Sequence, residues 1–255
     1  MAGLCLRHGD RPHGDAEIRH PRSARVLRKR PALAAPLRLR RAGSAERARG
    51  LNGAPPVVTP VVFDIGKVLI DFDPVAAFAP ELGGRDRADA FLARIDFARR
   101  NLRGDAGTPF ATLAAELDDA ADRALLARYP ELFPRAIARS IEGSFALIER
   151  LRARGHPVHA ITNFSAETWP TALRLHPRLG EVFDVTLVSG QLGIVKPDRR
   201  IFDRLTERTG ARPEACLFID DNAANVAGAR AAGWQAHLFK GPARLERALV
   251  AEGLL

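Results

Sequence analysis

Short apolar runs alternate along this chain with longer segments in which apolar residues recur every three or four positions. The run Val61–Phe63 is β-branched and wholly apolar, which is typical of a strand buried on both faces of a sheet. In the segment 141–154, by contrast, Phe145, Ile148 and Leu151 fall on one face of a helix. The same reasoning predicts strands at 158–161, 185–188, 216–219 and 235–239, and helices at 199–209, 222–232 and 242–251.

Strands that alternate with helices of this length predict an α/β fold with a parallel sheet. Residues 74–141 break the alternation, because they contain helical patterns and glycines but no strand-like run. We therefore expect a small α-helical cap inserted after the first strand, between core segments 57–73 and 142–255. Such an insert would lie over the carboxyl edge of the sheet, where open α/β folds bind ligands. Its expected helices cover 75–82, 87–102, 109–118, 121–127 and 134–139.

The composition places the chain among ordinary globular proteins. Of its 255 residues, 46% are hydrophobic and 27% are charged, which excludes a collagen-like, low-complexity or wholly disordered protein. No apolar run approaches the roughly 18 residues that a membrane-spanning helix needs. Two cysteines, Cys5 and Cys216, cannot form a disulfide framework, so a reducing compartment is favoured and we expect a cytoplasmic protein.

The positive charge is confined to the N-terminal segment. Residues 1–50 contain 13 Lys and Arg against 4 acidic residues, a balance of +9, which leaves 26 of each sign in the remainder. Residues 1–56 lack sustained periodicity, so we expect a disordered basic tail. The tail has no apolar signal core and no aromatic residues, so neither a membrane nor a specific nucleic-acid partner is predicted. A transit peptide and a later translation start near Val57 or Val58 both stay open.

Polar residues directly follow four of the predicted strands or their loops. Because the carboxyl ends of parallel strands meet at one edge of the sheet, these residues are expected to converge on one crevice. This convergence predicts an active site. Its members are Asp64 after the first strand, Thr162 and Asn163 after the second, Lys196 after the third, and Asp220, Asp221 and Asn222 after the fourth.

The residue types indicate a metal site and a nucleophile. Asp64 and Asp221 would repel each other at close range unless a hard divalent cation lay between them, and Mg²⁺ prefers carboxylate and carbonyl oxygens. Gly66 would expose its backbone carbonyl to the same ion, since it has no side chain to obstruct it. With a phosphate substrate neutralised in this way, one carboxylate could attack phosphorus.

The remaining polar residues would bind the phosphoryl group. Lys196 would stabilise the developing oxyanion and orient the nucleophile, while Thr162 and Asn163 would donate hydrogen bonds to phosphoryl oxygens. Each has a structural alternative. Segments 162–165 and 220–222 could cap the helices that follow them, and Lys196 could be a solvated loop residue. The order of all these residues along one sheet edge favours the catalytic interpretation.

The segments 63–70 (FDIGKVLI), 161–163 (ITN), 193–198 (GIVKPD) and 217–222 (LFIDDN) resemble, in this order, the four motifs of the haloacid dehalogenase-like hydrolase superfamily. The resemblance implies a Rossmann-like core, an inserted helical cap, and Mg²⁺-dependent phosphoryl transfer through an aspartyl-phosphate. It is greatest to the branch that contains an α-glucose-1-phosphate phosphatase. Motif matching implies that Asp64 is the nucleophile, Thr162 the phosphate-binding hydroxyl, Lys196 the stabilising lysine, Asp221 a direct metal ligand and Asp220 its support.

One position departs from the superfamily pattern. Most phosphatases of the superfamily carry an aspartate two residues after the nucleophile, where it acts as general acid and base, but this chain has Gly66 there. Asp71 and Asp73 are nearby candidates for the missing acid, although Asp73 before Pro74 is more simply explained as a helix N-cap. Lys67 would contact an anionic leaving group or point to solvent.

The leading hypothesis is a Mg²⁺-dependent phosphatase that acts on a small phosphorylated metabolite, such as a sugar phosphate. One alternative is a 2-haloacid dehalogenase, in which the same aspartate attacks carbon without a metal. The adjacent carboxylates of Asp220 and Asp221 argue against it, because they make sense mainly beside a cation. Another is a catalytically weak binding or regulatory protein that lost its acid at Gly66. The sequence predicts neither the substrate nor the oligomeric state.

Overall fold

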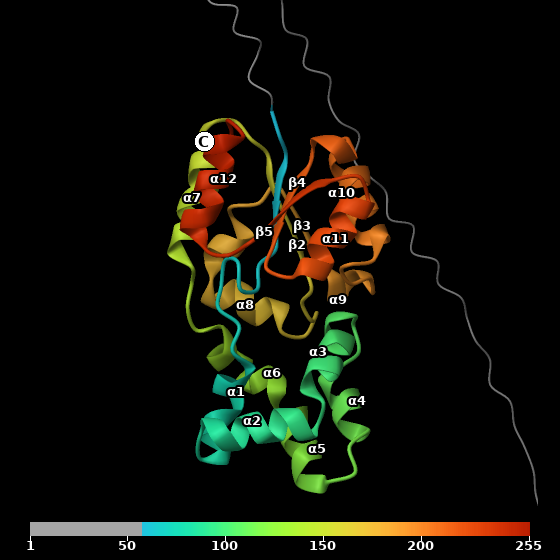
Figure 1. The fold of residues 1–255 in the computed structure, drawn as a ribbon. Coiled ribbons are helices and arrows are strands. Elements are labelled where there is room, and N and C mark those ends of the chain that lie inside the picture. The colour runs from blue at the N-terminus through green and yellow to red at the C-terminus, as the bar shows by residue number, and fades with distance from the viewer. Residues whose placement is uncertain (1–57) are drawn as a thin grey trace, which may run out of the picture. The chain divides into compact units, whose positions relative to one another are not determined.

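The computed structural model describes residues 58–255, so the tail predicted over 1–56 lies outside the described residues. Five strands form one parallel sheet in the order β3-β2-β1-β4-β5 (Figure 1). This arrangement confirms the predicted α/β, Rossmann-like architecture. The strands are β1 (Val61–Phe63), β2 (Val158–Thr162), β3 (Val185–Val188), β4 (Leu217–Asp220) and β5 (Gln235–Leu238).

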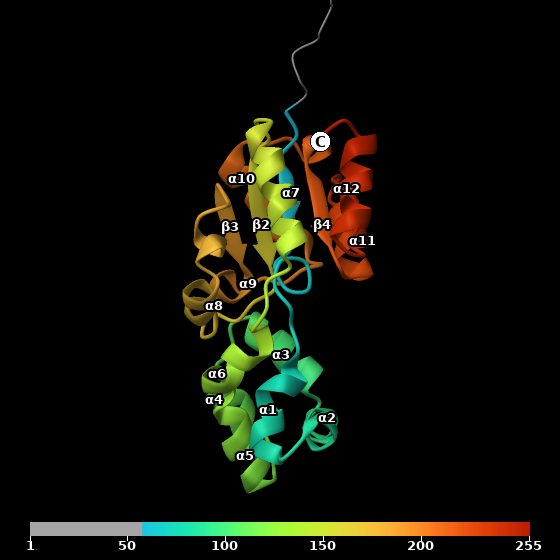
Figure 2. The same ribbon diagram turned by 90° about the vertical axis from the view of Figure 1, so that its left-hand side faces the viewer.

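Two pairs of helices cover the two faces of this sheet (Figures 1 and 2). Helices α7 (Glu142–Ala153) and α12 (Pro242–Ala251) lie on one face, and α10 (Arg199–Thr209) and α11 (Ala223–Ala231) lie on the other. The alternation of side chains along β1 explains why both faces are covered. Val61 and Phe63 belong to the apolar cluster of the first face, and Val62 to that of the second. All three are fully buried, and each such burial contributes about 1.5–3 kcal/mol.

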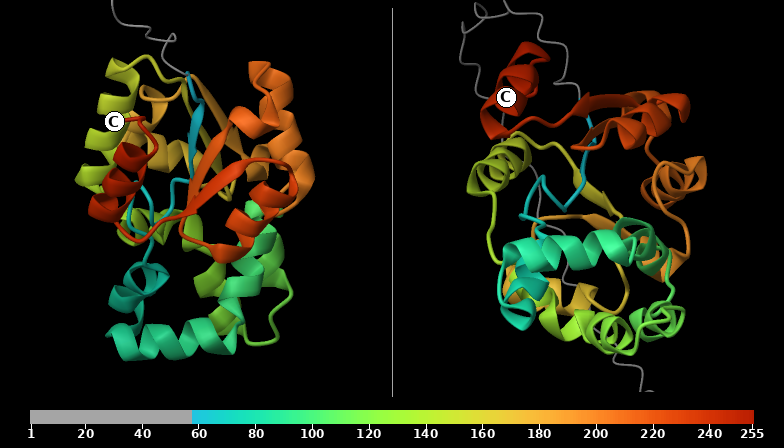
Figure 3. Two further views of the ribbon diagram at one scale, coloured as in Figure 1. Left: turned by 45° about the horizontal axis from the view of Figure 1, so that its top comes forward. Right: turned by 60° about the horizontal axis from the view of Figure 1, so that its bottom comes forward.

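Residues 74–141, here called the cap, contain helices and none of the five strands. The cap lies beyond the carboxyl ends of the strands (Figures 2 and 3). It is held by aromatic packing around Tyr129, whose ring centroid lies 4.7 Å from that of Phe110 and 5.0 Å from that of Phe97. Its helices are α1 (Pro74–Leu82), α2 (Arg85–Arg94), α3 (Phe97–Asp105), α4 (Phe110–Ala115), α5 (Ala120–Ala127) and α6 (Tyr129–Leu132), followed by a 3₁₀ helix, η1 (Phe133–Ile137).

The local structure differs from the sequence prediction inside the cap. The helix predicted over 87–102 is two helices, α2 and α3, because Asp96 adopts a left-handed conformation with φ of 48° and ends the first. The apolar pattern continues across this break without a glycine or proline to signal it. The helix predicted over 134–139 is the 3₁₀ helix η1, and the short helices α6, α8 (Trp169–Leu175) and α9 (Ser189–Leu192) were not predicted. Across 58–255, every helix is too short or too polar to cross a membrane.

Candidate active site

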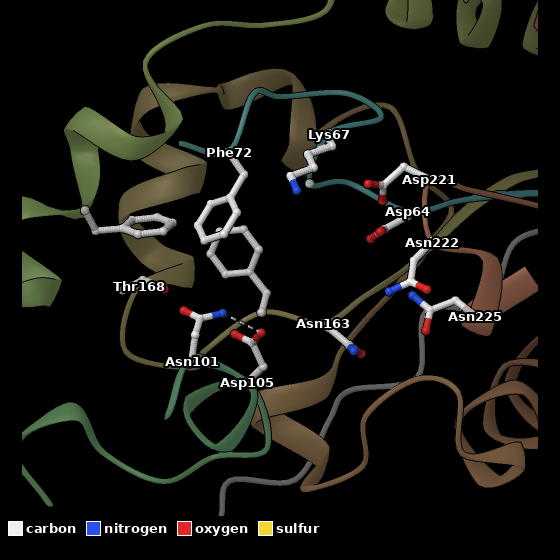
Figure 4. Close-up of a pocket in the computed structure, with 13 residues that line it drawn as sticks. Asp64, Lys67, Phe72, Asn101, Asp105, Asn163, Thr168, Asp221, Asn222 and Asn225 are labelled. Atoms are coloured by element: carbon white, nitrogen blue, oxygen red, sulfur yellow. Dashed lines mark hydrogen bonds between the residues drawn. The ribbon is translucent and has the colours of Figure 1, made fainter. Parts of the chain in front are cut away.

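The carboxyl ends of β1, β2 and β4 and the inner side of the cap enclose a cavity of about 210 Å³ (Figure 4). It contains most of the residues that the sequence placed at this edge. Asp64, Gly66, Asn163 and Asp221 line it directly. Asp220 and Lys196 lie behind its wall, in contact with Asp64 or with each other. Parallel strands therefore bring together residues that lie more than 150 positions apart in the sequence.

Lys196 is the centre of the buried part of the site. Its ammonium nitrogen lies 2.8 Å from Asp64 Oδ1 and 2.7 Å from Asp220 Oδ2, and it donates to the backbone carbonyl of Ile161 at 2.9 Å. The side chain has no exposed surface, so the interpretation as a solvated loop lysine is wrong. Burial of the ammonium group is tolerated because all three of its protons have oxygen partners.

Asp64 presents two differently engaged oxygens. Oδ1 accepts a hydrogen bond from the backbone N–H of Ile65 at 2.7 Å and contacts Lys196. Oδ2 accepts no hydrogen bond from any residue of the described part of the chain. The carboxylate is therefore fixed through one oxygen, while the other remains available to a ligand in the cavity.

Asp220 is fully buried and orders the loop after β4. Its Oδ1 accepts from the backbone N–H of Asn222 at 2.8 Å, and the side-chain amide of Asn225 lies 3.1 Å from both carboxylate oxygens. Together with Lys196, these donors engage both oxygens of Asp220. Asp221, the next residue, is only half-buried and faces the cavity. Adjacent aspartates thus have different surroundings, one inside the protein and one open to a ligand.

The acidic residues have the composition of a cation site. Asp64, Asp220 and Asp221 each offer a carboxylate oxygen, and these oxygens lie within 4.8 Å of one another. Gly66 lines the same cavity, and a Cβ atom added there would meet nothing within 4 Å. Carboxylate and backbone carbonyl oxygens are the ligands that Mg²⁺ prefers, so these residues fit a hard divalent cation.

Thr162, the last residue of β2, and Asn163, the next residue, have different surroundings. Asn163 uses both ends of its side chain on the backbone of Lys196, donating to its carbonyl at 3.1 Å and accepting from its N–H at 2.8 Å. It therefore fixes the loop that carries the lysine. Thr162 is 1% exposed at the end of β2. Neither residue caps α8, which follows Thr168 without a side-chain cap, so the capping alternative is wrong for this pair.

Burial and neighbouring charges shift the acidity of the site. Burial raises the pKa of Asp64 to about 7, against the opposing effect of Lys196. Burial and the charge of Asp220 also raise the pKa of Asp221. For Lys196, burial favours a lower pKa, but the charges of Asp64 and Asp220 outweigh it, and the net shift of its pKa is upward. The lysine thus stays protonated, and the excess of carboxylates favours binding of a cation.

Several residues near the site have structural roles that the sequence left open. Asn222 caps α11 by accepting from the N–H of Ala224 at 2.8 Å, as the capping alternative predicts. Asp73 caps α1 and pairs with Arg85 at 2.8 Å, and Asp71 pairs with Arg139 at 2.8 Å. Both candidates for the missing acid are therefore engaged outside the cavity.

The cap contributes residues that the sequence analysis missed. Asn101 and Asp105, both on α3, line the cavity opposite the core residues (Figure 4). Burial, and next the charge of Asp64, raise the pKa of Asp105 to about 7. The sequence carried no signal for Asp105, because the predicted helix ended at 102. In the structure Asp105 is at the C-terminal end of α3, where a carboxylate opposes the helix dipole. The other walls are formed by Phe72, Phe133, Phe164 and Thr168.

A sequence model of the haloacid dehalogenase-like hydrolase family matches residues 60–233. Among curated proteins, phosphatase MT3486 of Mycobacterium tuberculosis (strain CDC 1551 / Oshkosh) is 36% identical over 103 residues, which is 40% of this chain and 48% of that protein. The (S)-2-haloacid dehalogenase 4A of Burkholderia cepacia is 33% identical over 82 residues, 32% of this chain and 35% of that protein. The chain thus spans less than half the length of these relatives.

Solved structures share the fold. The structure of the HAD family enzyme bt-2542 from Bacteroides thetaiotaomicron, in complex with magnesium and inorganic phosphate, is 20% identical with a TM-score of 0.55. The alignment covers 72% of this chain and 95% of that one. The HAD-hydrolase YfnB from Bacillus subtilis, bound to magnesium, is 24% identical with a TM-score of 0.56, and the alignment covers 75% of this chain and 98% of that one.

Proposed function

Because the chain belongs to the haloacid dehalogenase-like hydrolase family, we propose that it is a magnesium-dependent phosphatase that acts through an aspartyl-phosphate on Asp64. The observation that carries the proposal is the buried arrangement around Lys196. A fully buried ammonium group holds one oxygen of Asp64 and leaves the other facing a cavity lined by a second carboxylate, Asp221. A phosphate monoester at this place would meet a nucleophile, a fixed positive charge and a cation site.

The cation would be held by Asp64, Asp221 and the carbonyl of Gly66. Asp220 completes the acidic cluster, but protein donors already engage both of its oxygens, so we assign it to orienting Lys196. When bound, Mg²⁺ would neutralise charge on the phosphoryl group. The phosphatase and dehalogenase names among the relatives show that both reactions occur among similar proteins. The cluster of three carboxylates favours the phosphatase, because these groups repel one another beside an anionic substrate unless a cation is present.

The residues of this chain then have distinct tasks. Asp64 Oδ2 attacks phosphorus, because Oδ1 is fixed by Ile65 and Lys196. Lys196 holds the attacking carboxylate in place and stabilises negative charge that develops beside it. Thr162, at the end of β2, would donate its hydroxyl proton to a phosphoryl oxygen. Asn163 keeps the Lys196 loop in register with β2 through its two hydrogen bonds to the lysine backbone.

We further propose a small sugar phosphate as the substrate class. The cavity of about 210 Å³ lies below the ~300–1,000 Å³ typical of sites for drug-sized ligands, which favours a small metabolite. Its walls combine aromatic surfaces (Phe72, Phe133 and Phe164) with amide and hydroxyl groups (Asn101 and Thr168). Aromatic faces with a few convergent polar groups suit a ring that carries hydroxyls. The buried, free Cys216 agrees with a reducing, cytoplasmic setting.

The test is turnover of 4-nitrophenyl phosphate with Mg²⁺, with EDTA, and by an Asp64→Asn variant. We expect chelation and the variant each to lower the rate by about 10⁴-fold or more, since each removes a group on which bond formation depends. Asp71→Asn is the matched control, because Asp71 is in the same loop but pairs with Arg139. It should keep the wild-type rate within about threefold.

Three other outcomes would contradict the proposal. Turnover that persists in EDTA would exclude the metal. Release of chloride from 2-chloropropionate, without phosphatase activity, would assign the chain to dehalogenation. Absence of turnover across a panel of phosphorylated sugars and nucleotides would favour a binding or regulatory protein.

A further inference from the structure

Phosphate ester cleavage through Asp64, on which this inference rests, needs a proton for the departing oxygen. Gly66 cannot supply it, although the position has room for a Cβ atom, which would meet no atom within 4 Å. Asp71 and Asp73 are occupied by arginines outside the cavity. Lys196 is enclosed by Asp64, Asp220 and the Ile161 carbonyl. Among residues 58–255, the core side of the cavity therefore offers no carboxyl group besides Asp64 and Asp221, which are assigned to the nucleophile and the cation.

The cap side has one. Asp105 is the last residue of α3, and its carboxylate lines the cavity across from Asp64 and Asp221 (Figure 4). Part of its surface is accessible, and that surface lies in the cavity wall. Its partner is uncharged: Asn101, one turn earlier on the same helix, donates to Oδ2 at 3.0 Å. Oδ1 accepts no side-chain hydrogen bond from the described residues, and a backbone hydrogen bond from Ser165 to the carboxylate opposes part of the rise in its pKa.

The core domain holds Asp105 in this position through contacts with the backbone of the cap. The hydroxyl of Ser189, at the start of α9, donates to the Asp105 carbonyl at 2.6 Å and accepts from the backbone N–H of Phe164 at 2.9 Å. Close by, a Cβ atom at Gly107 would lie 3.1 Å from the carbonyl oxygen of Gly190. The end of α3 thus packs against α9 at nearly backbone-to-backbone distance, and Asp105 cannot withdraw from the cavity without breaking this contact.

We propose that Asp105, supplied by the cap, is the general acid and base of the reaction in place of the side chain that Gly66 lacks. Its surroundings favour a carboxyl group that holds a proton near neutrality. Burial and the charge of Asp64 raise its pKa to about 7, and the C-terminal end of α3 disfavours its ionised form. A group that titrates near the working pH is suited to both giving and taking a proton.

The reaction then has two steps, and Asp105 gives a proton in the first and takes one in the second. In the first, Asp64 Oδ2 forms a bond to phosphorus, the bond from phosphorus to the ester oxygen breaks, and the Asp105 carboxyl gives its proton to that oxygen, which leaves as an alcohol. In the second, water forms a bond to phosphorus and passes a proton to the Asp105 carboxylate. The bond from phosphorus to Asp64 then breaks, which releases phosphate and restores both aspartates.

The test compares two aryl phosphates of similar shape but different leaving groups. The phenol released from 4-methylphenyl phosphate matches the tyrosine side chain, with a pKa of about 10, and needs a proton as it leaves. The nitro group of 4-nitrophenyl phosphate stabilises the phenolate, so that its departure needs little help. The measured quantity is kcat/KM in the presence of Mg²⁺, which reports formation of the aspartyl-phosphate.

We expect Asp105→Asn to lower kcat/KM by about 10²-fold or more for 4-methylphenyl phosphate, but by less than about threefold for 4-nitrophenyl phosphate. Retained turnover of the second ester shows that the variant is folded. Asp96→Asn, the same substitution at the other end of α3 and outside the cavity, should leave both values unchanged. An equal loss on both esters would overturn the proposal, because it would indicate a positioning or binding role, and so would no loss on either.

If the protein is not a metal-dependent phosphatase, the experiment gives a different result. In that case the wild-type protein turns over neither ester in a metal-dependent way, and the comparison between the two esters cannot arise. If only the assignment of Asp105 is wrong, the wild type hydrolyses both esters with Mg²⁺, and the variant responds to both alike.

Discussion

The two sides of the cavity are built in different ways. On the core side, Lys196, Asp64 and Asp220 form a buried ionic cluster at the ends of neighbouring strands, with the lysine completely enclosed. On the cap side, Asp105 is partly accessible at the end of a nine-residue helix. It is kept there by one side-chain hydrogen bond and one backbone contact with Ser189. The core side thus depends on the sheet for its geometry, and the cap side on how a few short helices pack.

This difference has a functional meaning. Residues that form the buried ionic cluster cannot be changed without exposing or unpairing a charge, so the chemistry they support is expected to be constant. Asn101 and Asp105, which line the cavity from the cap, are not part of a buried ion pair and can be exchanged at a smaller loss of folding free energy. We therefore expect core variants to lose both stability and activity, and cap variants to change activity or substrate dependence with little loss of stability.

The largest effect is expected from Lys196→Met. Removal of the ammonium group leaves the carboxylates of Asp64 and Asp220 buried without their partner, which should lower the free energy of unfolding by about 3–5 kcal/mol. The phosphatase rate should fall by about 10²-fold or more, because the charge beside the nucleophile is lost. Urea unfolding and initial rates measure the two effects.

Lys67→Met is the matched control for this variant. Lys67 lines the same cavity but is exposed, so its replacement should change the free energy of unfolding by less than about 0.5 kcal/mol. If Lys196→Met lowered the free energy of unfolding by less than about 1 kcal/mol, the core side would not depend on its buried ion pairs, and the difference from the cap side would be contradicted.

The core side could be predicted from the sequence, and the cap side could not. Asp64, Asp220 and Lys196 each follow a short apolar strand or its loop, and the rule that parallel strands share a carboxyl edge brings them together without knowledge of side-chain packing. Asp105 follows no such rule. Its place depends on the break at Asp96 and on the close approach of Gly107 and Gly190, neither of which has a local signal. The structural role of Asn163 also depends on a contact between residues 33 positions apart.

A smaller effect is expected from Ser189→Ala, which removes the hydroxyl that joins the cap to the core. The Asp105 carbonyl and the Phe164 N–H would each lose a partner, and the free energy of unfolding should fall by about 1–3 kcal/mol. Because the end of α3 would be held less firmly, kcat/KM should also fall, more for 4-methylphenyl than for 4-nitrophenyl phosphate.

Ser144→Ala provides the control for a buried hydroxyl. Ser144, on α7, is fully buried and its hydroxyl has no hydrogen-bond partner among the described residues, so its removal should not destabilise the protein. If the two serine variants were equally destabilised, the hydrogen bond between Ser189 and Asp105 would contribute no more to the free energy of unfolding than a buried hydroxyl without a partner.

The smallest effect, and the one of opposite sign, is expected from Asp105→Asn on stability. In the folded protein the pKa of Asp105 is raised to about 7 from its ordinary value of 3.8, so loss of its proton opposes folding as the pH rises between these values. The full shift would correspond to about 4 kcal/mol, but solvent screens a carboxyl group that is only partly buried. The variant should therefore gain about 1–2 kcal/mol over the wild type above pH 7, and nothing below about pH 4.

Thermal or urea unfolding across this pH range, in EDTA, measures the gain. A difference that stays constant with pH, or a variant less stable than the wild type at pH 7, would contradict the description of Asp105 as a half-buried carboxyl opposed by its surroundings. Asp96→Asn, on the same helix, should differ from the wild type by less than about 0.5 kcal/mol.

The nucleophilic role of Asp64 is tested most directly by trapping the covalent intermediate. The enzyme is mixed with Mg²⁺ and a phosphate ester, quenched within one turnover, and reduced with sodium borohydride, which converts an aspartyl-phosphate to homoserine. Tandem mass spectrometry should locate homoserine at position 64 and at none of Asp105, Asp220 or Asp221. Homoserine at another aspartate, or phosphate released with every aspartate intact, would contradict the account.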